Sequence, residues 1–156
     1  MIYVKDLIEV CNGKLLCGDI NLPLNNFSKD TRLINKDDVY IGIKGESFDG
    51  NKFYKDALDK GASVCILDNI DEVDDKYKDK TIVKVEDTIK AIGLLAKYKR
   101  SLYNIPVVAV TGSVGKTSTK DMIAAVLSTE YKVLKTEANY NNCLLYTSDA
   151  ADDLLC

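Results

Sequence analysis

The sequence contains no histidine at any of its 156 positions. Imidazole is the commonest general base in enzymes and a frequent zinc ligand, so its absence excludes Ser/His pairs, Cys/His pairs and Cys/His zinc sites from this chain. No two of the five cysteines form a C-x-x-C pair. We therefore expect Cys11, Cys17 and Cys65 to be small buried thiols of a protein from a reducing compartment.

Long hydrophobic runs are absent as well. The longest apolar run, Ile105 to Val110, is far shorter than the ~20 residues that span a bilayer. The N-terminal stretch MIYVKDLIEV carries charges where a signal peptide would need apolar residues. The formal charge of −3 comes from acids after residue 142, and the scattered basic residues give no electrostatic argument for nucleic-acid or membrane binding. The sequence therefore predicts a cytoplasmic globular protein that binds neither.

The first hundred residues show alternating helix and strand patterns. Apolar residues at Val4, Leu7, Ile8 and Cys11 share one helical face, and Asn12-Gly13 supplies a left-handed stop. Residues 39–43 alternate Val39, Ile41 and Ile43 inward, which predicts a strand buried on one face. We expect further strands at 63–68 and 81–87, and a loop or short strand at 22–32.

Two more helices are expected before residue 104. The first covers residues 48–63, with Phe53, Ala57 and Leu58 on its inner face and Gly61 as its stop. The second follows an Asp87 N-cap. Its predicted buried stripe consists of Ile89, Ile92, Leu95, Ala96 and Leu102. The sequence NIP then breaks this helix and predicts a domain boundary near residue 104.

A different pattern begins after this boundary. Residues 105–110 form a continuous apolar run, typical of a parallel strand buried on both faces. The loop TGSVGKTS leads into a helix with Met122, Ile123, Val126 and Leu127 on one face, and KVLKTE at 132–137 predicts the next strand. The predicted fold class is therefore α/β, with a small N-terminal α/β domain followed by the first strand–loop–helix–strand unit of a doubly wound domain.

The loop between the predicted strand and helix has the composition of a phosphate-binding loop. Gly112 and Gly115 let successive N–H groups turn towards an anion, and the helix that begins near Lys116 directs its positive end to the same place. Lys116 would then contact the β- and γ-phosphates, Thr117 a Mg²⁺ ion and Ser118 the α- and β-phosphates. The alternative is an ordinary glycine turn, but the flanking strand and helix favour a nucleotide site. Its residues are Gly112, Ser113, Val114, Gly115, Lys116, Thr117 and Ser118.

These motifs resemble the Mur ligase family. VVAVTGSVGKTSTKDMIAAVLS is similar to the family's ATP-binding segment, which uses T-G-x-x-G-K-T, so Val110 in place of the glycine of the strict consensus is expected there. KDTRLINKDDVYIGIKGESFDGNKFYKDALDKGAS resembles the family's D-S-R and K-G-x-x-x-D-G-H patterns, with Thr31 for Ser and Asn51 for His. TEANYNN carries an N-x-N-N, at Asn139, Asn141 and Asn142, typical of the branch that adds D-alanyl-D-alanine.

The resemblance covers residues 1–142 and implies a two-part organisation. Residues 1–103 would hold the UDP end of UDP-N-acetylmuramoyl-tripeptide, and residues 104–142 would begin the central domain that binds ATP and Mg²⁺. The reaction implied is ATP-driven ligation to D-alanyl-D-alanine through an acyl phosphate, by a monomer, with Lys116 stabilising phosphate charge.

The resemblance also implies the substrate-binding residues. It puts Thr31, Arg32 and the loop Glu46, Ser47 and Phe48 near the uridine diphosphate. Two alternatives stay open, a structural Asp30–Arg32 ion pair and a simple core role for Phe48. Asn141 and Asn142 would contact substrate or order the loop beside Mg²⁺.

The last residues depart from the family pattern. The stretch CLLYTSDAADD can be back-translated into a string that resembles a transposase adapter used in sequencing libraries. We therefore expect residues 143–156 to be an artefactual tail, the alternative being a divergent C-terminus. On that interpretation the ATP domain is truncated, the fragment is inactive, and residues 1–100 fold while 105–142 stay loose or aggregate.

Two other functions remain open at this point. The chain could be a non-catalytic module that binds UDP-sugar peptides and carries a vestigial phosphate loop. It could also belong to another P-loop enzyme, such as a small kinase, although the N-x-N-N and the N-terminal motifs argue against that.

Overall fold

A computed structural model describes residues 1–136 of the chain. The expectations about Asn139, Asn141, Asn142 and the tail 143–156 lie outside these described residues. No helix within residues 1–136 is both long and apolar enough to cross a membrane.

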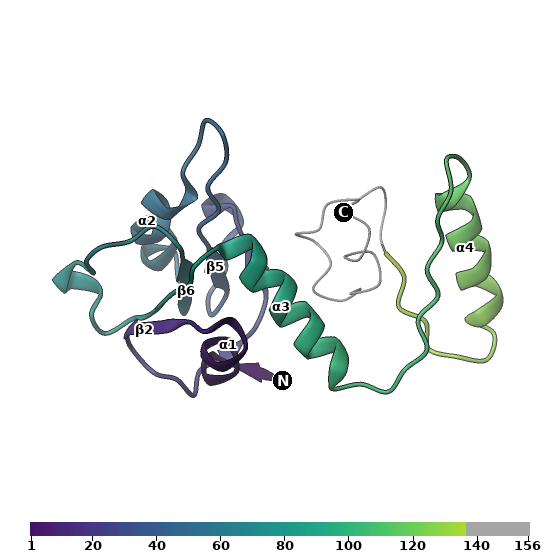
Figure 1. The fold of residues 1–156 in the computed structure, drawn as a ribbon, viewed down its shortest axis with the longest axis horizontal. Helices are drawn as coiled ribbons and strands as arrows, with labels where there is room; N and C mark the ends of the chain where they lie inside the picture. Colours follow the sequence, from purple (N-terminus) through teal and green to yellow (C-terminus); the bar gives the residue numbers. More distant parts are fainter. Residues whose placement is uncertain (137–156) are drawn as a thin grey trace.

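The structure is α/β, as the sequence predicted, and its centre is one five-stranded sheet (Figure 1). The strand order is β2-β7-β6-β5-β4. Strands β4 to β7 run parallel to one another, whereas β2 pairs antiparallel with β7 at one edge. Their bounds are β2 Lys14–Cys17, β4 Phe27–Ser28, β5 Val39–Ile41, β6 Val64–Leu67 and β7 Thr81–Lys84. A separate antiparallel pair joins β1 (Ile2–Tyr3) to β3 (Pro23–Leu24).

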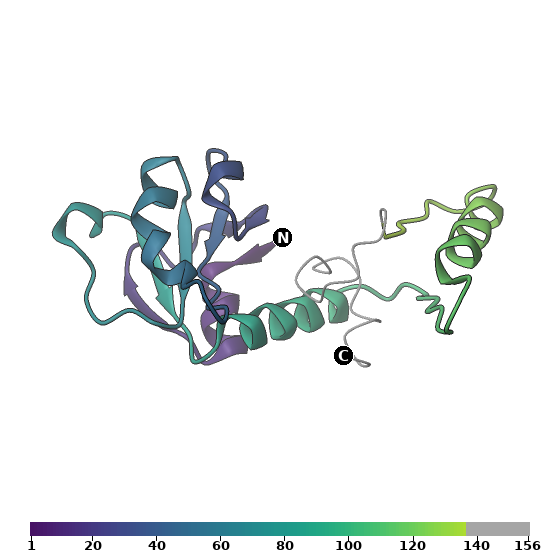
Figure 2. The same cartoon turned by 90° about the horizontal axis from the view of Figure 1, so that it is seen from above.

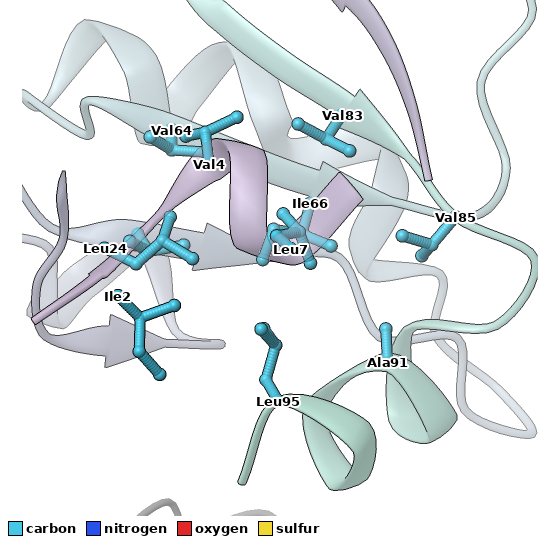
Figure 3. Packing of buried hydrophobic residues seen from close by; sticks show 11 residues of the cluster. Ile2, Val4, Leu7, Leu24, Val64, Ile66, Val83, Val85, Ala91 and Leu95 are labelled. Atoms are coloured by element: carbon cyan, nitrogen blue, oxygen red, sulfur yellow. The ribbon is translucent and has the colours of Figure 1, made fainter. Parts of the chain in front are cut away.

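Helices cover both faces of this sheet. Helices α1 (Val4–Cys11) and α3 (Thr88–Ser101) pack on one face, where apolar side chains from the strands meet Leu7 and Leu95 (Figure 3). Helix α2 (Tyr54–Asp59) covers the other face together with Tyr77. Short 3-10 turns complete this unit: η1 Thr31–Leu33, η2 Gly50–Phe53 and η3 Asp75–Tyr77.

The local signals for α1 and α3 are confirmed. Asn12 ends α1 in the left-handed conformation (φ 50°), which a short polar side chain tolerates better than most. Asp87 caps α3 by accepting a hydrogen bond from the backbone N–H of Lys90 at 2.9 Å. The α3 stripe is only partly right, because Ile89 and Leu102 are about half exposed.

Strand β5 is buried on both faces, so the prediction of a half-buried strand over 39–43 was wrong. Val39 and Ile41 are buried as expected, but Tyr40 between them is only 1% exposed and packs in the cluster under α2. The strand also ends at Ile41. Alternation cannot distinguish an aromatic residue on a solvated face from one under a second helical layer.

The helix expected over 48–63 is shorter and begins differently. Residues 50–53 form η2 and only Tyr54–Asp59 is α-helical. Ala57 and Leu58 are buried as predicted, but Phe53 is 40% exposed and Tyr54 takes the inner position. Gly61 (φ 110°) follows as the expected stop.

The region after residue 104 contains one helix and no strand among its described residues. Helix α4 (Lys116–Leu127) is present, but residues 105–110 are extended without a paired neighbour, and Val108 is 58% exposed. The doubly buried strand expected there is therefore not formed, and the strand expected at 132–137 is also absent over its described residues 132–136. A strand needs adjacent strands to satisfy its N–H and C=O groups, and no described segment lies beside it. Figures 1 and 2 show α4 standing apart from the sheet, with α3 pointing towards the connecting segment.

Candidate functional site

Two glycines shape the backbone of the predicted phosphate loop. Gly112 (φ 149°) and Gly115 (φ 78°) both have positive φ values that side-chain-bearing residues rarely adopt. Gly115 is also the N-cap of α4, and no side chain caps this helix end. The first helical hydrogen bond runs from the Thr119 N–H to the Gly115 carbonyl, so the preceding N–H groups remain available to an anion.

The charged and hydroxyl groups of this loop follow directly on the helix. Lys116, Thr117 and Ser118 occupy the first turn of α4, and all three are exposed. The Lys116 Nζ donates to the Gly112 carbonyl at 2.6 Å, so the ammonium group lies across the loop. The loop therefore combines a cation, free backbone donors and hydroxyl groups. Within residues 1–136, no group of three or more acidic or thiol side chains could hold a metal ion.

A second group of predicted site residues follows strands β4 and β5. These strands are parallel neighbours, with Phe27 paired to Val39 and Ser28 to Tyr40. Their carboxyl ends therefore lie at one edge of the sheet, where ligands of α/β proteins commonly bind. This places η1, with Thr31 and Arg32, on the same edge as the loop that contains Glu46, Ser47 and Phe48.

Arg32 forms the ion pair with Asp30 that the sequence left open. Its Nε and Nη2 donate to the Asp30 carboxylate at 2.9 and 2.6 Å, while Asp30 also accepts from the backbone N–H of Arg32. These hydrogen bonds lower the pKa of Asp30 to about 2. The Arg32 side chain is nevertheless 84% exposed, so the pair orients the guanidinium without covering it. Thr31 lies next to α2, where its side chain lowers the pKa of the Asp56 carboxyl.

The residues Gly45 to Phe48 form a tight turn at the tip of the loop. The Gly45 N–H donates to the Phe48 carbonyl at 2.7 Å, and Lys44 and Asp49 bridge antiparallel beneath the turn. Glu46 and Ser47 are exposed at its tip. Phe48 is 57% exposed and stacks on Phe53, so the interpretation of Phe48 as a core aromatic was wrong.

A buried polar network supports this loop, and sequence reasoning did not identify it. Asn51 is 3% exposed, and its amide donates to Asp49 and Asp68 at 2.8 Å each. Its side-chain oxygen accepts from the backbone N–H groups of Asp68 and Asn69. The Thr88 hydroxyl, at the start of α3, bonds Asp68 and the Gly42 carbonyl. The only sequence signal was Asn51 itself, at the position where the family more often has histidine.

The opposite edge of the sheet brings together none of the predicted site residues. A shallow hollow of about 340 Å³ lies there, at the amino ends of β5 to β7, and its polar lining includes Lys36, Asp37, Asp79 and Lys80.

Two family profiles match this chain. The profile described as "Mur ligase family, catalytic domain" matches residues 25–100, and "Mur ligase middle domain" matches residues 110–153. Together they include both groups of candidate site residues.

Curated relatives are named as ligases of UDP-N-acetylmuramoyl compounds. The UDP-N-acetylmuramoyl-tripeptide–D-alanyl-D-alanine ligase of Synechocystis is 39% identical over 89% of this chain, and that of Bacillus subtilis is 36% identical over 89%. The UDP-N-acetylmuramoyl-L-alanyl-D-glutamate–2,6-diaminopimelate ligase of Clostridium tetani is 34% identical over 80%. The chain spans 30%, 30% and 26% of the length of these three relatives.

Solved structures show the same likeness. MurF from Acinetobacter baumannii superimposes with a TM-score of 0.79 at 29% identity, over 91% of this chain and 31% of that one. MurF ligase from Thermotoga maritima, solved in complex with ADP, superimposes with a TM-score of 0.68 at 30% identity. The match covers 80% of this chain and 29% of that one. The agreement of both profiles, the relatives and these folds shows that the chain belongs to the Mur ligase family.

Proposed function

We propose that this chain is the N-terminal part of a ligase that joins D-alanyl-D-alanine to UDP-N-acetylmuramoyl-tripeptide with ATP. The observation that carries the proposal is the combination of two candidate sites in one chain. One is the glycine loop at the start of α4, and the other is the exposed Arg32 and the tight turn that follow the neighbouring parallel strands β4 and β5. Relatives that carry this activity in their names are up to 39% identical over most of the chain.

The two sites divide the work between two domains. Residues 1–103 are proposed to bind the UDP end of the substrate, through Thr31, Arg32 and the turn Glu46–Phe48. Residues 104–142 are proposed to begin the ATP-binding domain, with the loop Gly112–Ser118 around the phosphates. Asn141 and Asn142, outside the described residues, are proposed to lie next to the substrate or the metal. Residues 143–156 are still predicted to be an artefactual tail.

The phosphate loop supplies charge stabilisation to the proposed reaction. The substrate carboxylate attacks the γ-phosphorus of ATP, ADP leaves, and an acyl phosphate forms. The amine of D-alanyl-D-alanine then attacks the acyl carbon, the peptide bond forms, and phosphate leaves. Lys116 and the free N–H groups at the start of α4 would neutralise the charge on the transferred phosphoryl group.

A magnesium ion fits the donor set of this loop. The Thr117 hydroxyl, in the first turn of α4, is the kind of oxygen ligand that Mg²⁺ takes beside nucleotide phosphates. The ion would supply additional neutralisation of phosphate charge when bound. The reducing conditions implied by the free thiols Cys11, Cys17 and Cys65 suit a cytoplasmic enzyme, and a monomer is proposed.

Calorimetry with UDP and with Mg-ATP tests the two sites separately. We expect UDP to bind, and Lys116→Ala to leave its affinity unchanged because α4 lies away from the sheet. The non-catalytic module is the competing function, and it predicts UDP binding with no ATP site even in a longer protein. A protein that continues this chain to the relatives' full length should release phosphate from ATP only when both substrates are present. Release without D-alanyl-D-alanine, or none at all, would contradict the proposed ligase.

A further inference from the structure

Helix α3 ends in a turn that is fixed to residues 1–101, the first region of the chain. Leu95 of this helix is buried in the core, and the Tyr98 hydroxyl donates to the Asp6 carboxylate of α1 at 3.4 Å. The Ser101 hydroxyl donates to the Tyr98 carbonyl at 2.7 Å. Carbonyls in the last turn of a helix have no partner within the helix, so this bond helps to close the end of α3. The segment that follows α3 therefore starts from a fixed point of the first region.

Arg100 connects this helix end to the segment that leaves it. Its Nη1 donates to the Tyr103 carbonyl and its Nη2 to the Ile105 carbonyl, both at 2.6 Å. The Arg100 carbonyl also accepts from the Tyr103 N–H at 3.2 Å, so Arg100 holds Tyr103 through both backbone and side chain. Hydrogen bonds from a charged donor are about twice as strong as neutral ones. Because the guanidinium is a rigid planar fork, it fixes the two carbonyls relative to the helix.

Little else holds the segment after Tyr103. Within residues 1–136, the bond from Arg100 to Ile105 is the only hydrogen bond that reaches residues 104–111. Packing does not hold the segment either, because Ile105, Val107 and Val108 are 55%, 41% and 58% exposed. Pro106 has a fixed φ and restricts Ile105 to extended backbone. The chain is therefore stiff at residues 105–106, and the direction of this stiff piece from α3 depends on Arg100.

We propose that Arg100 is a positioning residue at the hinge formed by residues 102–106, where its guanidinium sets the angle at which the chain leaves α3. Residues 105–110, which it directs, lead straight into the loop Gly112–Ser118 (Figure 2). The angle therefore limits where that loop stands relative to the first region.

This inference goes beyond the proposed function and needs neither UDP nor ATP. In the proposed ligase it has a consequence, because the substrate is held by the first region and the transferred phosphoryl group by the second. The two must meet in one geometry, and a restrained hinge narrows the orientations to be searched.

The alternative is that Arg100 is an ordinary surface cation at a helix end. Lys99 is its neighbour in the last turn of α3 and is exposed. A cation near the C-terminus of a helix is favourable whether or not it bonds to anything beyond the helix. Only Arg100 of the two bonds to carbonyls past the end of α3 in the described structure, so Lys99 provides a matched control.

Backbone order parameters from ¹⁵N relaxation of the whole chain, without ligand, measure the hinge directly. Rigid backbone gives values of about 0.85 and flexible backbone values below about 0.6. We expect Tyr103 and Ile105 to be rigid in the unaltered chain and to fall below about 0.6 in Arg100→Gln. Arg100→Lys keeps the charge but loses the fork, so it should lower the values as well. Lys99→Gln should leave them unchanged.

Urea midpoints separate positioning from a general structural role. All three variants should unfold at the same midpoint as the unaltered chain, and the order parameters of residues 95–100 should stay high, because the bonds lost lie outside the core. A lower midpoint together with disorder throughout the end of α3 would mean that Arg100 only prevents fraying, and this would overturn the inference.

Three further outcomes would also overturn it. These are a flexible Ile105 in the unaltered chain, unchanged order in Arg100→Gln, and full order in Arg100→Lys, which would assign the effect to charge alone. Since no ligand is present, none of these results bears on the proposed function, which the calorimetry tests separately.

Discussion

Residues 1–101 and residues 105–136 contain similar apolar patterns, but only the first region buries them. Val64 and Ile66 in β6 are fully buried between two helical layers. Val107 and Val108, in an equally apolar run, are 41% and 58% exposed, and Met122 and Val126 of α4 are about 70% exposed. An apolar run therefore becomes a buried strand only where neighbouring strands and helices are present.

The two candidate sites differ in the same way. The turn Gly45–Phe48 is closed by its own hydrogen bond, and the flanking residues Gly50 and Gly42 accept hydrogen bonds from Tyr40 of β5 and Thr88 of α3. The phosphate loop Gly112–Ser118 is shaped by its own glycines and by the start of α4. One site is built by tertiary structure and the other by local structure, and this distinction can be tested by mutation.

The largest expected effect comes from truncating a core residue of the first region. Ile66→Ala removes a side chain with no solvent exposure and should lower the free energy of unfolding by about 2–5 kcal/mol. Val108→Ala is the comparison in the second region, and it should change the free energy of unfolding by less than about 0.5 kcal/mol. Urea unfolding followed by circular dichroism measures both. Equal losses would mean that residues 105–110 also belong to a packed core.

A somewhat smaller effect is expected at the polar network under the turn. Asn51→Leu leaves Asp49 and Asp68 without their amide partner in a buried position, which should cost about 1–3 kcal/mol. Asn69→Ala, an exposed residue bonded to the same Asp49, is the control and should cost less than about 0.5 kcal/mol. UDP affinity should fall for Asn51→Leu as the turn loosens. A stable Asn51→Leu variant with unchanged affinity would show that the network does not hold the turn.

The helices α3 and α4 differ in how their first turns are capped. Asp87→Ala removes the side chain that caps α3 and should cost about 1 kcal/mol, within a range of about 0.5–2. Asp87→Asn keeps an oxygen acceptor and should recover most of that loss. Helix α4 has no side-chain cap to remove, because Gly115 occupies its N-cap. Thermal unfolding of both Asp87 variants measures the difference, and identical losses would argue against a capping role.

The smallest expected effect concerns pH. Hydrogen bonds to Arg32, Lys55 and Lys76 lower the folded-state pKa values of Asp30, Asp74 and Asp59, respectively. All three lie below the ordinary aspartate pKa of 3.8. Stability from these groups is therefore complete above about pH 4 and is lost as the pH falls through the lowered values, to about pH 2 for Asp30. All three pairs are on the surface, so each contribution is modest and decreases with salt.

Urea midpoints between pH 5 and pH 2 measure this loss of stability. Asp30→Asn should flatten the lowest part of the profile. A midpoint that rises on acidification would contradict the sign.

Local signals in the sequence predicted much of this fold. The spacing of Val4 to Cys11, the Asn12 stop and the Asp87 cap are confirmed because each acts through neighbours within a few residues. The parallel strands β6 and β7 were also recognisable as apolar runs. The burial of both faces of β5 was not recognisable, because the burial of Tyr40 depends on packing against α2, which comes later in the sequence.

The candidate sites show the same limit. The glycines of the phosphate loop predict an anion site from sequence alone, because the φ preference of glycine is a local property. The buried Asn51 network depends on contacts between the loop after β5, Asp68 after β6 and Thr88 at the start of α3, which no spacing rule encodes. Antiparallel β2 was missed for the same reason, since its pairing with β7 joins residues nearly seventy positions apart.

Amide hydrogen exchange on the whole chain, with and without UDP, can compare the two regions in one experiment. We expect strong protection in β5 to β7 and α3, little in residues 105–111, and added protection from UDP at residues 30–33 and 44–50. Uniform protection across both regions would contradict the difference between them. A UDP effect confined to residues 112–118 would contradict the proposed division of the two sites.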